Sequence, residues 1–415
     1  MSKTPLTVNG REYTWPENPL VVVCVDGSQP AYIEEAIKAG VMPFTQKMLA
    51  NGSDLRADCV VPSFTNPNNL SIVTGCPPAV HGICGNFILD PDSGEEVMMN
   101  DPKYLRVDTI MKSFHDAGGS VAVVTAKDKL RTLLGKGLDF TSGRALAFSS
   151  EKSDQVTLAE NGIENVLEMV GKPVPSVYSA ELSEFIFAAG VKLLESRRPD
   201  LMYLSTTDYV QHKHAPGSEG ANSFYVMMDG YWKQLDALGA TIAITADHGM
   251  NAKHNTADGQ PKVVYLQEVM DDWLGEGVAR VILPITDPYV VHHGALGGYG
   301  TVYLPEGTDM VDLCKKIEAI EGVEVALTNA EACERFELPP ELVGDLVIIS
   351  VADTAIGTAP ARHDLSGLNE PLRSHGGISE QRVPLIFSKP VTPGAEQGRL
   401  RNFDIFNIAL NHLQS

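Results

Sequence analysis

Short runs of apolar residues alternate, up to about residue 256, with longer segments in which apolar residues recur at helical spacing. The runs lie at 21–25 (VVVCV), 59–62 (CVVP), 120–125 (SVAVVT), 200–206 (DLMYLST) and 240–246 (ATIAITA). Continuous apolar runs are typical of parallel strands covered on both faces. The longer segments predict helices at 32–50, 68–74, 107–117, 180–196 and 218–238. We therefore expect an α/β fold with a mostly parallel sheet sandwiched by helices.

The pattern changes after residue 256. Between 257 and 370, short strand-like runs alternate with one helical segment near 310–320, which predicts a smaller α+β insertion. The earlier pattern resumes with a strand at 384–388 and a helix from Asp404. We expect a core made of 1–256 and 371–415, with 257–370 as a cap. Residues 141–178 are polar and weakly patterned, and we expect an irregular excursion there.

Composition limits the partners of this 415-residue chain. A formal net charge of -21 argues against nucleic acid or an anionic membrane, because both require clustered Lys and Arg. A small anionic substrate remains compatible if a few cations gather in one pocket. We find no signal peptide and no membrane span, so we expect a cytoplasmic protein. The six cysteines form no CxxC pair and are expected to be reduced.

Residues able to bind metal or phosphate follow the predicted strands at their C-terminal ends. In open parallel sheets, the crevice outside these ends is where ligands bind. We therefore expect these residues to lie together at one edge of the sheet: Asp26, Thr65, Lys127, Asp208 and Asp247–His248.

The Asp and His residues predict a metal site. Asp208 and His212 are four residues apart, which places both on one face of a helical turn. Asp247 and His248 are adjacent, and His375 lies in SHGG, beside small residues. Carboxylate and imidazole ligands without thiolates favour Zn²⁺ over Mn²⁺ or Fe. Their number suggests two ions sharing a phosphorus substrate, although each residue alone has an ordinary role in a turn, a cap or a hydrogen bond.

Thr65 lies at the turn between a predicted strand and a predicted helix. A hydroxyl there faces the unpaired N–H groups and the positive end of the helix. The same N–H groups can hold phosphate oxygens, so Thr65 is placed to attack phosphorus. The ordinary alternative is that Thr65 only caps the helix.

Taken together, these segments resemble the alkaline phosphatase superfamily, and most closely its nucleotide pyrophosphatase/phosphodiesterase-like branch. The matching segments are VDG at Asp26, SFTNPNNLSIVTGCPPAVHGI at Thr65, DYVQH, TADHGM and SHGG. The resemblance covers the core and implies an alkaline phosphatase-like fold with two zinc ions per subunit around a Ser or Thr nucleophile. It implies that one zinc is held by Asp26, Thr65, Asp247 and His248, and the other by Asp208, His212 and His375. Asn86, in HGICGNF, matches the position whose amide contacts phosphoryl oxygens.

Two lysines suggest the substrate. Lys127 and Lys129, in VVTAKDKLRTLL, point the same way if the segment is extended, and their ammonium groups suit a carboxylate beyond the phosphorus group. Solvated surface lysine is the ordinary alternative. The segment resembles the phosphonate-hydrolysing members of the branch. That implies hydrolysis of the C–P bond of phosphonoacetate to acetate and phosphate through phospho-Thr65, with Asn86, both lysines and His212 contacting the substrate.

Other functions remain compatible with the same residues and motifs. The same two-zinc site supports phosphodiester or phosphomonoester hydrolysis, and a non-catalytic, zinc-dependent phosphonate-binding protein is an alternative of another class. The sequence allows a homodimer without indicating one. The remaining histidines of interest are left unassigned, with turn or supporting roles favoured over metal ligation: His81, His214, His292 and His293.

Overall fold

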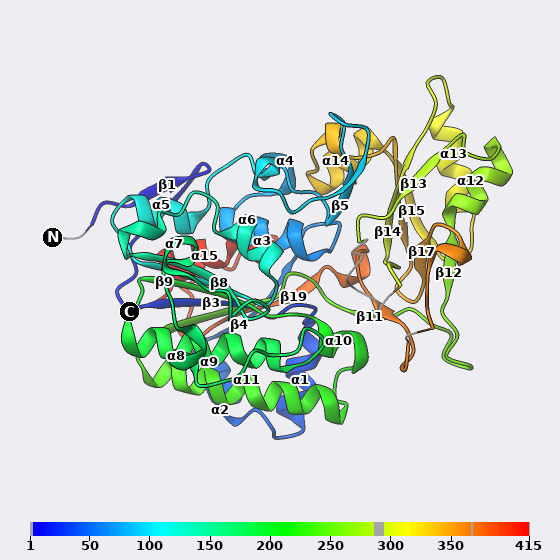
Figure 1. The fold of residues 1–415 in the computed structure, drawn as a ribbon. Coiled ribbons are helices and arrows are strands. Elements are labelled where there is room, and N and C mark those ends of the chain that lie inside the picture. Colours follow the sequence, from blue (N-terminus) through cyan, green and yellow to red (C-terminus); the bar gives the residue numbers. More distant parts are fainter. Residues whose placement is uncertain (1–2, 286–293, 367, 415) are drawn as a thin grey trace.

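The computed structural model describes residues 3–285, 294–366 and 368–414 (Figure 1). Its central sheet has seven strands: β3 (Leu20–Cys24), β4 (Ser53–Asp58), β7 (Val121–Thr125), β8 (Ala145–Ser149), β9 (Leu201–Ser205), β10 (Thr241–Thr245) and β19 (Arg382–Phe387). They lie in the order β4-β19-β10-β3-β9-β7-β8. The five strands from β10 to β8 pair in parallel, whereas β19 is antiparallel to both its neighbours. The predicted mostly parallel α/β fold is confirmed.

Both faces of this sheet are covered, which explains why its strands are continuously apolar. Leu20, Val22 and Cys24 of β3 pack into one buried cluster, and Val21 and Val23 pack into another on the opposite face. Figure 1 shows the two helical layers. One contains α3 (Thr65–Thr74), α5 (Ile110–Asp116), α6 (Asp128–Leu134) and α15 (Ile405–Asn411); the other contains α1 (Pro30–Lys38), α2 (Pro43–Asn51), α9 (Glu181–Ser196) and α11 (Glu219–Ala237).

The predicted strand at 59–62 is wrong. The strand of this region, β4, ends at Asp58, and the apolar run that follows is buried without entering the sheet. The Cys59 N–H donates to the Gln381 carbonyl at 2.8 Å, and the Val60 N–H donates to Asn68 Oδ1 at 2.7 Å. These bonds replace a strand ladder, so a buried apolar run here does not require a strand.

Two further predictions need correction. The segment 141–178 is not an irregular excursion, because it contains the edge strand β8 together with α7 (Leu158–Asn161) and α8 (Val166–Val170). The five residues of β8 are a short run beside polar segments, which hid the strand. The helix predicted at 32–50 is two helices: Gly40 adopts a φ of 75° after α1, and Pro43 begins α2.

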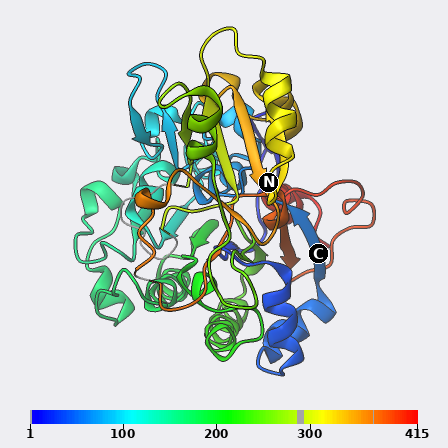
Figure 2. The same ribbon diagram turned by 90° about the vertical axis from the view of Figure 1, so that its right-hand side faces the viewer.

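The described residues between 257 and 370 contain both helices and strands, as predicted, and they lie at the viewer's side in Figure 2. Its antiparallel sheet has the order β13-β14-β16-β15, made of β13 (Arg280–Ile282), β14 (Tyr299–Tyr303), β16 (Leu346–Ser350) and β15 (Val323–Thr328). The predicted helix near 310–320 is α13 (Met310–Glu318), while α12 (Leu266–Leu274) and α14 (Asn329–Phe336) were not predicted. Tyr299 and Ile349 share a buried apolar cluster with Phe64 and Leu70 of the core. The division into core and cap stays a prediction.

Among the residues that the structure describes, no helix combines the length and the apolar character needed to cross a membrane.

Candidate metal centre and active site

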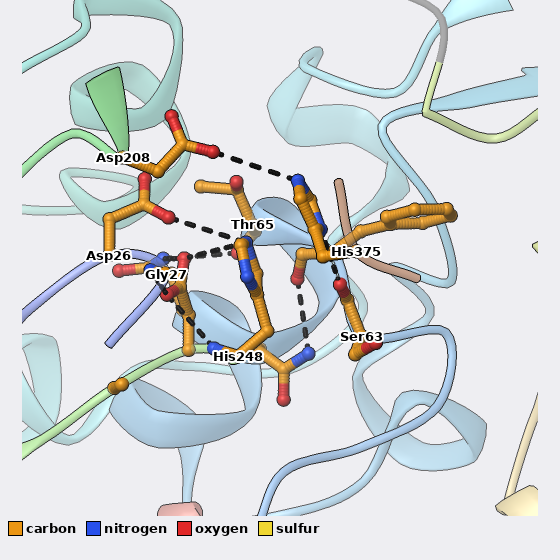
Figure 3. Close-up of polar contacts among 12 residues, drawn as sticks. Asp26, Gly27, Ser63, Thr65, Asp208, His248 and His375 are labelled. Atoms are coloured by element: carbon orange, nitrogen blue, oxygen red, sulfur yellow. Dashed lines mark hydrogen bonds and ion pairs between the residues drawn. The ribbon is translucent and has the colours of Figure 1, made fainter. Parts of the chain in front are cut away.

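The site lies at the C-terminal edge of the central sheet. Asp26, Asp208 and Asp247 follow β3, β9 and β10, which are neighbours in the sheet and run parallel. Parallel strands bring their C-terminal ends to one edge, so the three carboxylates converge there. Figure 3 shows Asp26 and Asp208 with Thr65 and His375 at this edge. They border a cavity of about 360 Å³, which is also lined by Asn86, Lys127 and Lys129.

The first candidate metal cluster consists of Asp26, Asp247 and His248, which are all buried. One ligand atom from each lies within 4.8 Å of the others. His248 Nε2 lies 3.3 Å from Asp26 Oδ1 and 3.7 Å from Asp247 Oδ2. His248 Nδ1 lies 2.9 Å from the Gly249 carbonyl, an acceptor that requires the ring proton on Nδ1. The Nε2 lone pair therefore faces the carboxylates, as a metal ligand requires.

The second candidate cluster consists of Asp208, His212 and His375, whose ligand atoms also lie within 4.8 Å of one another. The predicted i,i+4 pair is confirmed: Asp208 precedes α10 (Tyr209–Lys213), and His212 Nε2 lies 2.8 Å from its Oδ2. Each ring nitrogen Nδ1 donates to a carbonyl, that of Arg373 at 2.8 Å for His212 and that of Ser63 at 2.7 Å for His375. Both Nε2 atoms therefore point toward Asp208.

The electrostatics of both clusters suit cations. Burial raises the pKa of the Asp26 carboxyl well above its usual value, and the Asp247 and Asp208 carboxylates raise it further. Burial, followed by the neighbouring His248, lowers the pKa of His375 well below its usual value, which keeps that ring neutral. Asp26 Oδ1 and His248 Nε2 are buried and make no hydrogen bond to any part of the described chain. Buried carboxylates without a cation are costly, so the two clusters fit a bimetallic site.

Thr65 begins the helix α3 and does not cap it. The capping position is Phe64, whose side chain provides no cap, so the interpretation of Thr65 as a simple cap is wrong. Within the described ranges, the Thr65 hydroxyl makes no hydrogen bond. It faces the cavity that Asp26, Asp208 and His375 border. The hydroxyl is therefore available to a ligand in the cavity.

Asn86 lies beside Thr65 with its amide held in one orientation. Its Oδ1 accepts the backbone N–H of Asn66, the second residue of α3, at 3.0 Å. The backbone N–H of Asn86 donates to the Pro284 carbonyl at 2.9 Å, which ties the residue to the 257–370 segment. Since the oxygen is engaged by a donor, the Nδ2 group is the part of the amide that can donate to a ligand. The sequence did not single out Asn66, although it lies within the quoted SFTNPNN segment.

Lys127 and Lys129 line the same cavity, as predicted, but the reason given for it is wrong. The segment is not extended throughout: Lys127 precedes α6 without a side-chain capping bond, and Lys129 lies in the first turn of this helix. The intervening Asp128 turns away to pair with Arg131 at 3.0 Å, which leaves the two lysines at the cavity. Lys127 Nζ also lies 5.9 Å from the centroid of the Tyr178 ring. Tyr178, Tyr209 and Glu151 line the cavity too, and no motif in the sequence marked them.

The described histidines that were left unassigned lie outside the two metal clusters. His81 is buried, with Nε2 at 2.8 Å from Ser71 Oγ and Nδ1 accepting the Ile83 N–H. Burial, followed by the charge of Arg106, lowers its pKa to about 3, so it is a neutral structural residue. His214 contributes its carbonyl, which accepts the Tyr32 hydroxyl at 2.7 Å. His292 and His293 lie outside the described residues.

The model of the family "Type I phosphodiesterase / nucleotide pyrophosphatase" matches residues 20–377, so the chain belongs to that family. Two crystal structures of phosphonoacetate hydrolase from Sinorhizobium meliloti 1021 are 60% and 59% identical to this chain, in complexes with phosphonoformate and with phosphonoacetate. Each has a TM-score of 0.95 and covers 99% of both chains. Murine ectonucleotide pyrophosphatase / phosphodiesterase 5 is 16% identical, with 96% of both chains covered and a TM-score of 0.63, and shares the fold.

Curated relatives match over shorter stretches. Phosphonoacetate hydrolase of Penicillium oxalicum is 39% identical over 72 residues, which are 17% of this chain and 89% of that protein. Ectonucleotide pyrophosphatase/phosphodiesterase C27A7.3 of Caenorhabditis elegans is 35% identical over 83 residues, 19% of this chain. The chain covers 10% of that protein's length.

Proposed function

We propose that the protein is a zinc-dependent hydrolase that cleaves the C–P bond of phosphonoacetate, giving acetate and phosphate. The observation that carries the proposal is the convergence, at one cavity, of the Thr65 hydroxyl, members of both Asp/His clusters and two lysines. The 60% identity to phosphonoacetate hydrolase of Sinorhizobium meliloti, over nearly the whole chain, supports this substrate. The cavity residues give each part of phosphonoacetate a partner.

Two zinc ions per subunit would be held by the two clusters, with Thr65 completing the first. The mixed carboxylate and imidazole ligands, without thiolates, favour zinc. Bound there, the ions would supply Lewis acidity at the phosphoryl oxygens. The carbonyls of Ser63, Arg373 and Gly249 fix the three imidazoles in the tautomer that such ligation needs.

Thr65 is the proposed nucleophile. Its oxygen attacks phosphorus and forms the P–O bond of phospho-Thr65 as the P–C bond breaks, and the hydroxyl proton passes to solvent water. The start of α3 favours the negative charge that gathers there. Asn86 Nδ2 donates to a phosphoryl oxygen, because Asn66 already engages Asn86 Oδ1.

Lys127 and Lys129 act at the other end of the substrate. The electron pair of the broken P–C bond leaves on carbon, where the adjacent carboxylate delocalises it as an enediolate. Two ammonium groups beside that carboxylate bind it in the ground state and stabilise the added charge as it develops. Protonation at carbon then yields acetate, and water hydrolyses phospho-Thr65 to phosphate, which restores the hydroxyl. His212 belongs to the second cluster, and its proposed role is to contact the substrate as well as to hold metal.

Ester hydrolysis is the second candidate, because the chain belongs to the type I phosphodiesterase family. A non-catalytic phosphonate-binding protein is disfavoured, since such a protein would not need the hydroxyl of Thr65 at the cavity. The discriminating experiment measures kcat/KM of the zinc-loaded protein for phosphonoacetate, p-nitrophenyl phosphate and a p-nitrophenyl nucleotide diester. We expect phosphonoacetate to have the highest value. Faster cleavage of either ester would favour ester hydrolysis. Binding of phosphonoacetate without turnover of any of the three compounds would favour the non-catalytic binding protein.

A further inference from the structure

Asn69 lies on α3, the helix that Thr65 begins, and its side chain is fully buried. None of the roles described above involves it. Its Oδ1 accepts two hydroxyls of β9, Tyr203 at 2.7 Å and Ser205 at 2.9 Å. Its Nδ2 donates to Asp247 Oδ2 at 3.2 Å and to the Thr65 carbonyl at 3.0 Å. One side chain therefore links the nucleophile helix, strand β9 and a carboxylate of the first metal cluster.

The orientation of this amide follows from its partners. The Thr65 carbonyl can only accept, so the NH₂ group must face it, and the same NH₂ group then also faces Asp247 Oδ2. The hydroxyls of Tyr203 and Ser205 can donate, and they are left facing the amide oxygen. A flipped amide would place its oxygen against Asp247 Oδ2, oxygen against oxygen. The two hydroxyls thereby hold Asn69 in the one orientation that gives Asp247 a donor.

Asp247 depends on that donor for its own orientation. Its Oδ1 is held by two backbone N–H groups, Gly27 at 3.2 Å and His248 at 3.0 Å. Its Oδ2, which lies 3.7 Å from His248 Nε2, receives its side-chain hydrogen bond from Asn69. Asp247 is completely buried, so no solvent replaces a missing donor.

We infer that Asn69 is a positioning residue for the first metal cluster: it fixes the Asp247 carboxylate and joins it to the start of the nucleophile helix. The inference deepens the proposed metal centre and rests on it. Outer hydrogen-bond partners of metal ligands commonly change metal affinity about 10- to 100-fold when they are removed. We expect removal of the Asn69 amide to weaken the affinity for the metal held by Asp26, Asp247 and His248 by the same factor. Metal affinity at the cluster around Asp208 should not change.

Two variants separate positioning from simple packing. Asn69→Leu keeps a similar volume but removes the donor, and it also leaves the buried Tyr203 and Ser205 hydroxyls without an acceptor, which lowers stability. Adding Tyr203→Phe and Ser205→Ala removes those hydroxyls, because replacing all partners by apolar groups can be nearly neutral. The triple variant is therefore expected to recover much of the melting temperature of the wild-type protein.

Zinc binding to the metal-free proteins is the deciding measurement, by calorimetric titration with a competing chelator. The wild-type protein is expected to bind two equivalents. The triple variant is expected to bind one equivalent with unchanged affinity and the other about 10- to 100-fold more weakly. If a stable triple variant binds both zinc equivalents with the affinities of the wild-type protein, the inference about Asn69 is overturned, but the proposed metal centre is not. A wild-type chain that binds no zinc would overturn the metal centre and the inference with it.

Discussion

The imidazole rings of His248 and His375 stack in parallel, with their centroids 3.6 Å apart and 8° between their planes. The two residues belong to different clusters, so this contact makes the two candidate metal sites immediate neighbours. Each ring is held from outside by a backbone carbonyl, of Gly249 and of Ser63. Ions held by the two clusters would both be close enough to polarise one phosphoryl group. Thr65, the first residue of α3, borders the cavity that His375 also lines.

Thr65→Ala is expected to reduce phosphonoacetate turnover by at least about a thousandfold, because the attacking oxygen is lost. Zinc content is expected to stay near two equivalents, since the Asp and His ligands remain. Phosphate release and metal analysis of the same preparation check both statements. Thr65→Ser is the matched control: it keeps the hydroxyl and should retain measurable turnover. Near-normal activity of Thr65→Ala would remove this residue as the nucleophile.

Lys127→Ala is expected to be selective for the substrate. Loss of one group that stabilises developing charge costs about 10²- to 10³-fold, and we expect that loss in kcat/KM for phosphonoacetate. Hydrolysis of p-nitrophenyl phosphate, which has no carboxylate, should fall much less. Lys152→Ala is the control, because Lys152 pairs with Asp128 outside the cavity lining. Equal losses on both substrates would assign Lys127 to the phosphoryl end or to the fold.

Asn86→Asp tests the phosphoryl end. The new carboxylate can still accept the Asn66 N–H, so the local structure is expected to persist. It replaces the donor that faces the substrate by a negative charge, which repels phosphoryl oxygens. Turnover of phosphonoacetate and of p-nitrophenyl phosphate should therefore fall together, in contrast to Lys127→Ala. A loss confined to phosphonoacetate would contradict the assigned role.

The ion pair between Lys253 and Glu380 makes the free energy of unfolding depend on pH. The two charges are fully buried and lie 3.0 Å apart, and Glu380 also accepts the N–H of Gly377, near His375. Burial alone would raise the pKa of Glu380, but Lys253 and hydrogen bonds from Ser379 and Asn251 outweigh it and lower the pKa. The ionised Glu380 carboxylate therefore contributes its full stabilisation above the pKa of glutamate in an unfolded chain, about 4.3. This contribution is lost as the pH falls through the lower pKa that Glu380 has in the folded protein.

Glu380→Gln is expected to lower the free energy of unfolding at pH 7 by about 3–5 kcal/mol, because it leaves Lys253 buried without its counter-charge. The difference from the wild-type protein should shrink below about pH 4. Urea unfolding at several pH values measures both effects. Glu341→Gln is the control, an exposed partner of Arg106 whose loss should cost at most about 1 kcal/mol. A difference that does not change with pH would contradict the charge-based account.

Much of the site could be predicted because it depends on strand ends. Asp26, Asp208 and Asp247 each follow an apolar run, and parallel pairing places the ends of those runs together. The position of Asn69 could not be predicted, because its partners lie about 135 to 180 residues away and depend on how α3 packs against β9 and β10. The strand β8 was missed because its run of four apolar residues before Ser149 is short and lies between polar segments. A homodimer stays a prediction.

The most direct test of the account follows both halves of phosphonoacetate with the zinc-loaded protein in isotopically labelled water. C–P cleavage predicts acetate and phosphate in equal amounts, with one water oxygen in the phosphate and, in D₂O, one deuterium in the acetate methyl group. A chelator should stop both products together. Unchanged phosphonoacetate under conditions where the same preparation cleaves an aryl or nucleotide ester would contradict the account and assign the site to ester hydrolysis.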